Sequence, residues 1–223
     1  MEIRVVRALH QIKRQLGVHT TKRYMQTKCW KCGIERSRRA LFCDKCNMIQ
    51  SPEVKDNYFK VFEIEERYDV DLKNLRNKYR NMQSVLHPDK FSTKTDEEKH
   101  ISEEYSSLIN KAYNSLLTPI ARAVHLLNIK GGKIDEEQKI EDPAFLMEIM
   151  EINEQIDEAE TPDDIRKLNE QNQKVMSELG DKIAQCFNSN NLNGAKDFII
   201  KLKYFTSINN RISNLMRERG MVD

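Results

Sequence analysis

The chain has 223 residues, of which 32% are charged, with a net charge of +2 and a mean hydropathy of −0.72. The charge gives the chain as a whole no bias toward nucleic acid or anionic lipid, and no apolar run approaches the roughly 20 residues that span a bilayer. With few glycines and prolines, this composition predicts an all-α, water-soluble protein made of several small units.

The first 28 residues are basic and contain a single acid, Glu2. Ile3, Val6, Ile12 and Leu16 can share one side of a helix. The basic residues are Arg4, Arg7, Lys13, Arg14, Lys22, Arg23 and Lys28. An arginine-rich, acid-poor amphipathic start is typical of a mitochondrial transit peptide, which we predict for residues 1–27. The alternatives are a cytosolic basic tail and a tail that contacts RNA.

Four of the five cysteines lie in the stretch CWKCGIERSRRALFCDKC, as Cys29, Cys32, Cys43 and Cys46. Two Cys-x-x-Cys pairs can place four thiolates around one soft cation. We predict a structural zinc module over residues 28–52, with iron as the less favoured metal. Paired disulfides are disfavoured because no secretory segment is present. A closed four-thiolate site also leaves no coordination position for a substrate.

Three arginines lie between the cysteine pairs, Arg36, Arg38 and Arg39. They would fit a nucleic-acid-binding zinc ribbon or a solvated loop. We favour the solvated loop.

Residues 56–128 show helical periodicity after Ser51-Pro52. A short aromatic segment comes first, followed by a longer apolar stripe and then a third helix around INKAYNSLL that Pro119 perturbs or ends. The expected buried positions are Tyr58, Phe59 and Phe62; Leu72, Leu75, Tyr79, Met82 and Leu86; and Tyr105, Leu108, Ala112 and Leu116.

A polar linker is expected over residues 129–141, followed by an antiparallel three-helix bundle over 142–219. Asp142-Pro143 can begin one helix, and Thr161 with Asp164 can form a capping box for the next. A last helix from about Leu192 completes the bundle. Expected core positions in the second and third helices are Ile165, Leu168, Val175, Leu179 and Ile183, then Phe198, Leu202, Phe205, Ile208, Ile212 and Leu215.

The first bundle helix has more apolar surface than a core requires. Counted at about 100° per residue, Phe145, Ile149, Ile152 and Ile156 share one arc. A second arc combines apolar residues with acids, namely Leu146, Met147, Met150, Glu151, Glu154 and Glu158. A methionine-containing patch bordered by charge is typical of a partner site. The alternative is that the helix over 102–127 covers it.

The stretch SVLHPDKFS, residues 84–92, interrupts the helical pattern with His87, Pro88 and Asp89. A helix stop explains Pro88 but not its two neighbours. An enzyme could use His87 as a base and Asp89 to orient it. No activated nucleophile or phosphate-binding glycine loop accompanies them, so we predict that the chain is not an enzyme.

In order and spacing, residues 57–118 resemble a J-domain. J-domains bind DnaK-type chaperones and stimulate their ATP hydrolysis, and the resemblance implies contacts through His87, Pro88 and Asp89. Basic residues of the second helix steer such encounters, which implicates Lys73, Arg76, Lys78, Arg80 and Lys90. Many J-domains have a basic residue and tyrosine just before the histidine, where this chain has Val85 and Leu86.

Together with DPAFLMEIMEINEQIDEAE at 142–160, the chain resembles HscB-type iron–sulfur co-chaperones of the animal-like form, which carry a tetracysteine module. The resemblance implies that the bundle holds an IscU-type scaffold through Leu146, Met147, Met150, Glu151, Glu154, Glu158 and Tyr204. It also implies a DnaK/HscA-type chaperone partner and a location in the mitochondrial matrix, with the cytoplasm as an additional site. Recipient apoproteins and self-association are further candidates, whereas nucleic acid and membrane are not expected. The rival hypotheses are a general J-protein with another client and a zinc-ribbon nucleic-acid adaptor.

Overall fold

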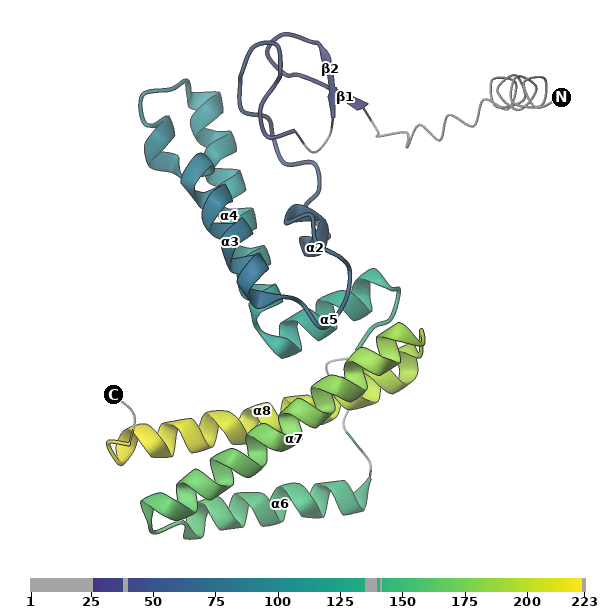
Figure 1. Cartoon of the computed structure of the whole chain (residues 1–223), viewed down its shortest axis with the longest axis vertical. Coiled ribbons are helices and arrows are strands. Elements are labelled where there is room, and N and C mark those ends of the chain that lie inside the picture. The colour runs from purple at the N-terminus through teal and green to yellow at the C-terminus, as the bar shows by residue number, and fades with distance from the viewer. Residues whose placement is uncertain (1–25, 38–39, 135–139, 141, 222–223) are drawn as a thin grey trace, which may run out of the picture. The chain divides into compact units, whose positions relative to one another are not determined.

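The computed structural model describes residues 26–37, 40–134, 140 and 142–221 (Figure 1). The chain divides into two compact units, Met1–Glu53 and Val54–Asp223. Most of the predicted transit peptide, residues 1–25, lies outside the described residues, as do Arg38, Arg39 and part of the predicted linker, 135–139 and 141. In the part of the chain that the structure describes, no helix has the length and apolar character needed to cross a membrane.

The first unit contains a two-stranded antiparallel sheet, β1 (Gln26–Lys28) and β2 (Glu35–Ser37), in which Gln26 pairs with Ser37. Between the strands, Gly33 has a φ of 70°, a conformation that glycine adopts without steric cost. Among the described residues of this unit, the buried apolar ones include Cys29, Cys43, Ile49 and Pro52. So small a core rarely holds a fold alone, which is consistent with a metal-stabilised module.

The second unit begins with the short helix α2 (Tyr58–Val61), followed by α3 (Leu72–Leu86), the 3₁₀ turn η1 (Pro88–Phe91), α4 (Asp96–Leu117) and α5 (Pro119–Ile129). Local chemistry explains the ends of these helices. Asp71 caps α3, and Thr95 forms a capping box with Glu98 at the start of α4. Pro119 occupies the first turn of α5, where its missing N–H costs no hydrogen bond.

The core of these helices follows the predicted stripes in part, because four of the positions expected to be buried are only half-buried, namely Tyr58, Tyr79, Met82 and Leu108. Phe59, Phe62, Leu75 and Leu86 are buried, and the buried face of α4 comprises Ile101, Tyr105, Ile109, Ala112 and Leu116. Leu72, expected in the stripe of α3, is 41% exposed. It is the first residue of α3, and Leu75, one turn further on, is the first buried residue of the helix.

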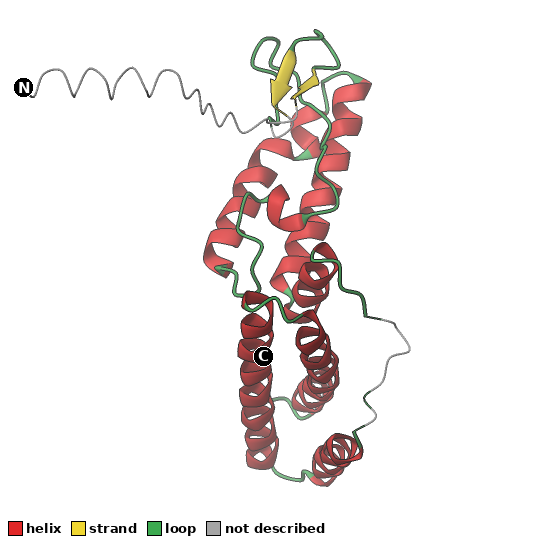
Figure 2. Ribbon diagram, turned by 90° about the vertical axis from the view of Figure 1, so that its right-hand side faces the viewer, coloured by secondary structure: helices red, strands yellow, loops and turns green. Residues whose placement is uncertain are grey.

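Helices α6 (Pro143–Glu158), α7 (Pro162–Asn188) and α8 (Leu192–Glu218) form the bundle. Asp142 caps α6, and the predicted capping box of Thr161 and Asp164 is present at α7. Helices α7 and α8 lie side by side and run in opposite directions (Figures 1 and 2). Their core includes Ile165, Leu168, Leu179, Ile183, Ile199, Leu202, Phe205, Ile208 and Ile212. The all-α prediction is confirmed, with the small sheet of the first unit as an addition.

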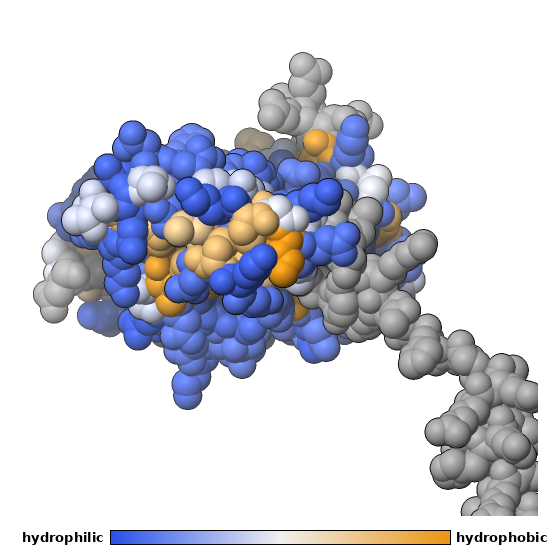
Figure 3. Space-filling view, turned by 90° about the horizontal axis from the view of Figure 1, so that it is seen from above, coloured by the Kyte–Doolittle hydropathy of each residue, from blue (hydrophilic) through white to orange (hydrophobic). Residues whose placement is uncertain are grey.

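The surface reflects the charged composition of the chain. On the face in Figure 3, hydrophilic residues predominate and surround a gathered group of apolar ones. Exposed large hydrophobic residues include Trp30, Ile34, Leu146, Met147 and Met150. Of these, Leu146, Met147 and Met150 were predicted to form a partner site.

Candidate functional site

The His-Pro-Asp loop begins where α3 ends. His87 has φ −62° and ψ 131°, the extended conformation that a following proline favours, so the helix stops at Leu86. Pro88 then starts η1, and the Asp89 N–H donates to Nδ1 of His87 at 3.3 Å. The backbone of the tripeptide is therefore fixed by proline and by a local hydrogen bond.

Both polar side chains of the loop are open to solvent. The His87 side chain is 52% exposed and that of Asp89 is 90% exposed, with Nδ1 of His87 3.4 Å from Oδ2 of Asp89. Such side chains can make charge-assisted hydrogen bonds to a partner without rearrangement. Within the described residues, the two side chains contact each other and the loop backbone, with no hydrogen bond to a hydroxyl or thiol group.

Two buried residues anchor this loop, and sequence patterns did not identify them as anchors. Ser102 of α4 is fully buried, and its hydroxyl donates to the carbonyl oxygen of Leu86 at 2.9 Å. That carbonyl is one of the acceptors left unpaired at a helix C-terminus. Phe91, at the other end of η1, is buried as well. The only sequence signal for Ser102 is a serine on the apolar side of a helix.

The basic residues of α3 do not all face the same way. Counted at about 100° per residue, Lys73, Arg76 and Arg80 lie within about 60° of one another, at roughly 100–160° from the buried Leu75. All three are exposed, as is Lys90 in η1. Lys78 is half-buried and lies on the flank of the helix instead. The structure thus brings three of the four predicted basic residues of α3 together as one row.

The predicted arc on α6 is exposed. Leu146 is 37% exposed, and Met147 and Met150 are each 61% exposed. Glu151, Glu154 and Glu158 are exposed beside them. These six residues form what we call the Leu/Met/Glu face. The alternative that the helix over 102–127 covers this face is wrong.

Tyr204 of α8 is half-buried, and its ring packs edge-on against that of Phe145 at 5.5 Å between centroids. Phe145 also contacts the Phe205 ring and is itself buried. Tyr204 therefore supports the N-terminal end of α6 and keeps part of its ring accessible. Both the packing role and the surface role considered for it are compatible with this position.

The four cysteines of the first unit converge. The Sγ atoms of Cys29 and Cys46 are 3.6 Å apart, as are those of Cys32 and Cys43, and all four lie within 4.8 Å of one another. Tetrahedral coordination with metal–sulfur bonds of about 2.3 Å requires sulfurs about 3.8 Å apart. The four residues could therefore hold one metal ion.

Hydrogen bonds to the sulfur atoms change the pKa values of these cysteines. Burial opposes ionisation of Cys29, but N–H donors from Cys32 and Lys31 outweigh it and lower the pKa of Cys29 to about 6. At Cys46 the N–H of Met48 lowers the pKa, but burial and the neighbouring sulfurs raise the pKa to about 12. A bound cation would favour the thiolate form of these cysteines, because it compensates the repulsion between neighbouring thiolates.

Arg36 departs from the solvated loop that was expected for it. The residue is 7% exposed, and its guanidinium pairs with Glu53 at 3.1 Å and donates to the carbonyl oxygens of Ser37 and Ala40. The two carbonyl oxygens belong to the adjoining loop, whereas Glu53 lies 17 residues further along the chain. Arg36 consequently serves the fold of the module and is not free to bind nucleic acid.

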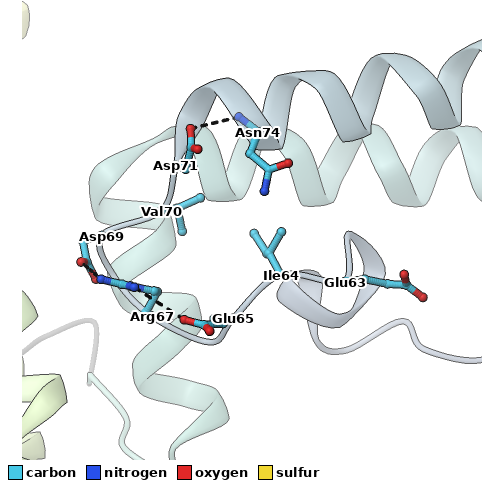
Figure 4. Close-up of a pocket in the computed structure, with 8 residues that line it drawn as sticks. All are labelled: Glu63, Ile64, Glu65, Arg67, Asp69, Val70, Asp71 and Asn74. Atoms are coloured by element: carbon cyan, nitrogen blue, oxygen red, sulfur yellow. Dashed lines mark hydrogen bonds and ion pairs between the residues drawn. The ribbon is translucent and has the colours of Figure 1, made fainter.

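A polar hollow of about 580 Å³ lies in the loop between α2 and α3. Figure 4 shows Arg67 between Glu65 and Asp69, with which it forms ion pairs. The Arg67 guanidinium lowers the pKa of Asp69. Asp71 accepts from the N–H of Asn74 and so caps α3. Arg67, Glu65 and Asp69 thus pair with one another, and none of the eight lining residues is a histidine, cysteine or serine.

Comparison with known proteins decides the family. Residues 141–213 match the family model described as the HSCB C-terminal oligomerisation domain. The chain is 34% identical over 190 residues to the human iron–sulfur cluster co-chaperone protein HscB, covering 83% of this chain and 80% of the human protein. The chain belongs to the HscB family. It is also 32% identical to an HscB homologue of Arabidopsis thaliana, over 79% of this chain and 69% of that protein.

The crystal structure of human HscB has the same fold, with a TM-score of 0.77 and 33% identity over 84% of this chain and 97% of that one. HscB relatives carry the name co-chaperone. Within an HscB-type fold, the exposed His-Pro-Asp loop, the Leu/Met/Glu face and the cysteine cluster are therefore candidate contact and metal sites.

Proposed function

We propose that this chain is a non-enzymatic adaptor in iron–sulfur cluster biogenesis. In this proposal the bundle holds an IscU-type scaffold protein, and the His-Pro-Asp loop stimulates ATP hydrolysis by a DnaK/HscA-type chaperone. Hydrolysis in the chaperone then favours transfer of the cluster from the scaffold to recipient apoproteins. Family membership supports the general role, and the two exposed sites support the two contacts.

The exposure of Met147 and Met150 is the observation that carries the scaffold contact. Two methionines at 61% exposure next to Leu146 are costly to leave in water, and flexible thioether side chains adapt well to a partner surface. The exposed glutamates beside them would give the contact a polar, charged rim. Tyr204 would add an aromatic edge to the same site.

The chaperone contact would use His87, Pro88 and Asp89, whose polar side chains are exposed on a fixed backbone. Lys73, Arg76 and Arg80 form one exposed row on α3, and Lys90 adds a charge in η1. Exposed cations of this kind raise the rate of association with an acidic surface more than the affinity. Half-buried Lys78 would contribute less.

We further propose that the cysteine cluster holds zinc, because a closed four-sulfur site suits a redox-inert structural ion. Cys29, Cys32, Cys43 and Cys46 would be its ligands. The unit boundaries would be 28–52 for this module, 56–128 for the J-domain and 142–219 for the bundle. The basic, amphipathic residues 1–27 support import into the mitochondrial matrix.

Isothermal titration of the purified chain with an IscU-type scaffold tests the first contact. A triple variant with alanine at Leu146, Met147 and Met150 should bind at least about tenfold more weakly, because apolar anchors carry most of the energy of such contacts. Glu148→Ala is the matched control, since Glu148 is exposed on α6 but lies outside the Leu/Met/Glu face. If the triple variant bound the scaffold as tightly as the wild-type chain, the proposed scaffold contact would be refuted.

Assays with the same purified proteins distinguish the rival functions. A general J-protein with another client would stimulate the chaperone ATPase without binding the scaffold. A zinc-ribbon adaptor would bind RNA or DNA with an affinity that falls steeply as salt concentration rises. The buried, paired guanidinium of Arg36 argues against that third function.

A further inference from the structure

The helix that carries the Leu/Met/Glu face is the least buried helix of the bundle. All residues of α6 are described, and two of them, Phe145 and Ile156, are buried. By contrast, α7 and α8 each bury seven. With only two buried side chains on its inner face, the rotation of a helix about its axis is weakly fixed by the core, so other contacts help to determine which residues it exposes.

Arg211 of α8 supplies such contacts. Its guanidinium donates to Oδ1 of Asn153 at 2.7 Å and to the backbone oxygen of Asn153 at 3.4 Å, and it forms an ion pair with Asp157. The guanidinium group of Arg211 therefore bonds to two side chains that lie one turn apart on α6. Asn153 is held in place in turn, because its Nδ2 donates to the carbonyl oxygen of Ile149 at 2.7 Å.

The two residues that Arg211 engages continue the apolar stripe of the Leu/Met/Glu face. Counted at about 100° per residue, Leu146, Met150, Asn153 and Asp157 lie within about 60° of one another. A rotation of α6 that moved Asn153 and Asp157 away from Arg211 would move Leu146 and Met150 by the same angle. The planar guanidinium, which binds two acceptors in a fixed geometry, suits this task better than lysine.

We propose that Arg211 is a positioning residue for the scaffold contact, fixing the rotation of α6 so that Met147 and Met150 face the partner. The proposal rests on the proposed function of the Leu/Met/Glu face. The Arg211 and Asp157 side chains are 40% and 67% exposed, and such exposed pairs add little to stability. Loss of the Arg211 side chain should therefore change the orientation of α6 and the affinity for the scaffold more than the melting temperature.

The test uses the full chain with Arg211→Ala and, as a second variant of nearly unchanged shape, Asp157→Asn. Two quantities are measured: affinity for an IscU-type scaffold, and the ¹³C-methyl NMR signals of Met147 and Met150 in the free protein. We expect Arg211→Ala to bind about threefold to tenfold more weakly, the usual effect of losing one or two hydrogen bonds. The methionine methyl signals should shift. Asp157→Asn should act in the same direction and more weakly.

Arg217→Ala is the matched control, because Arg217 lies on α8 and donates to Ser213 and Asn214 of its own helix. It should leave binding and methyl signals unchanged. Weaker binding by Arg211→Ala with unmoved methyl signals would mean direct contact with the scaffold and would overturn the positioning role. Unchanged binding would overturn it too. If the triple alanine variant also binds the scaffold normally, the scaffold site itself is refuted. If the triple variant loses binding but Arg211→Ala does not, only the role of Arg211 is refuted.

Discussion

Replacement of Ser102 by alanine removes the hydrogen bond that holds the end of α3 next to the His-Pro-Asp loop. Ser102 is fully buried and donates to the carbonyl oxygen of Leu86 at 2.9 Å. Leaving a buried acceptor without its donor costs about 1–3 kcal/mol. In a unit of this size, roughly 2–4 °C of melting temperature accompany each kcal/mol, so Ser102→Ala should melt about 2–12 °C lower.

The substitution should also weaken the function assigned to the loop. His87 follows Leu86 directly, so a helix end that is less firmly held presents the imidazole in a wider range of positions. We expect stimulation of the chaperone ATPase to fall severalfold, in line with about 1 kcal/mol of lost preorganisation. Scaffold binding, which uses α6, should be unchanged.

Thermal unfolding by circular dichroism and steady-state ATPase assays provide both readouts. Ser107→Ala is the control, because Ser107 lies on the same helix and is exposed. An unchanged melting temperature for Ser102→Ala would show that the hydrogen bond has no net value. A lower melting temperature with full ATPase stimulation would show that the loop does not depend on this anchor.

Three further predictions concern acidity, metal and charge. Burial lowers the pKa of His125 below its ordinary value of 6.5, and its Nε2 accepts the Tyr58 N–H at 3.0 Å. Stability that is complete above about pH 6.5 should therefore be lost as pH falls through the lowered pKa, and His125→Phe should remove this part of the pH dependence of melting. Trp30 is the single tryptophan of the chain and donates to the Ile49 oxygen at 2.6 Å. Chelation should therefore shift its fluorescence while leaving the helical dichroism nearly unchanged. Arg76→Glu should slow association with the chaperone severalfold at low salt and much less at high salt, measured by stopped flow.

Each of these has its own control. If the melting temperature of His125→Phe still fell at low pH in the same way, a group other than His125 would be responsible. Cys186→Ser should keep the metal-dependent fluorescence, because Cys186 lies in α7, whereas Cys29→Ser should abolish it. Lys78→Ala should leave the association rate nearly unchanged. If it slowed association as much as Arg76→Glu does, the claim that the exposed basic row on α3 speeds association would be refuted.

Local signals in the sequence predict much of this structure. Asp142-Pro143 and the capping box of Thr161 and Asp164 begin helices where they were expected. Pro88 ends α3 because the residue before proline leaves the helical conformation. The separation of core and exposed arcs on α6 follows from helical periodicity alone, and burial confirms it for Phe145, Ile156 and the two methionines.

Contacts between distant parts of the chain could not be predicted in this way. The Ser102 hydroxyl bonds a carbonyl 16 residues away, and Arg211 bonds Asn153 58 residues away. The sequence does not show that Arg36 is buried, because its ion-pair partner, Glu53, lies 17 residues further on. Periodicity identifies which face of a helix is apolar, but it contains no information about which side chain on another helix meets the polar residues beside that face.

The central claim is that one chain couples a scaffold to a chaperone through two separate sites, and ATP hydrolysis by a DnaK/HscA-type chaperone tests it most directly. The rate should rise with wild-type chain and rise further when an IscU-type scaffold is added. His87→Gln should abolish stimulation while retaining scaffold binding. The triple alanine variant at Leu146, Met147 and Met150 should retain basal stimulation but lose the increase caused by scaffold. Full, scaffold-enhanced stimulation by either variant would contradict the account.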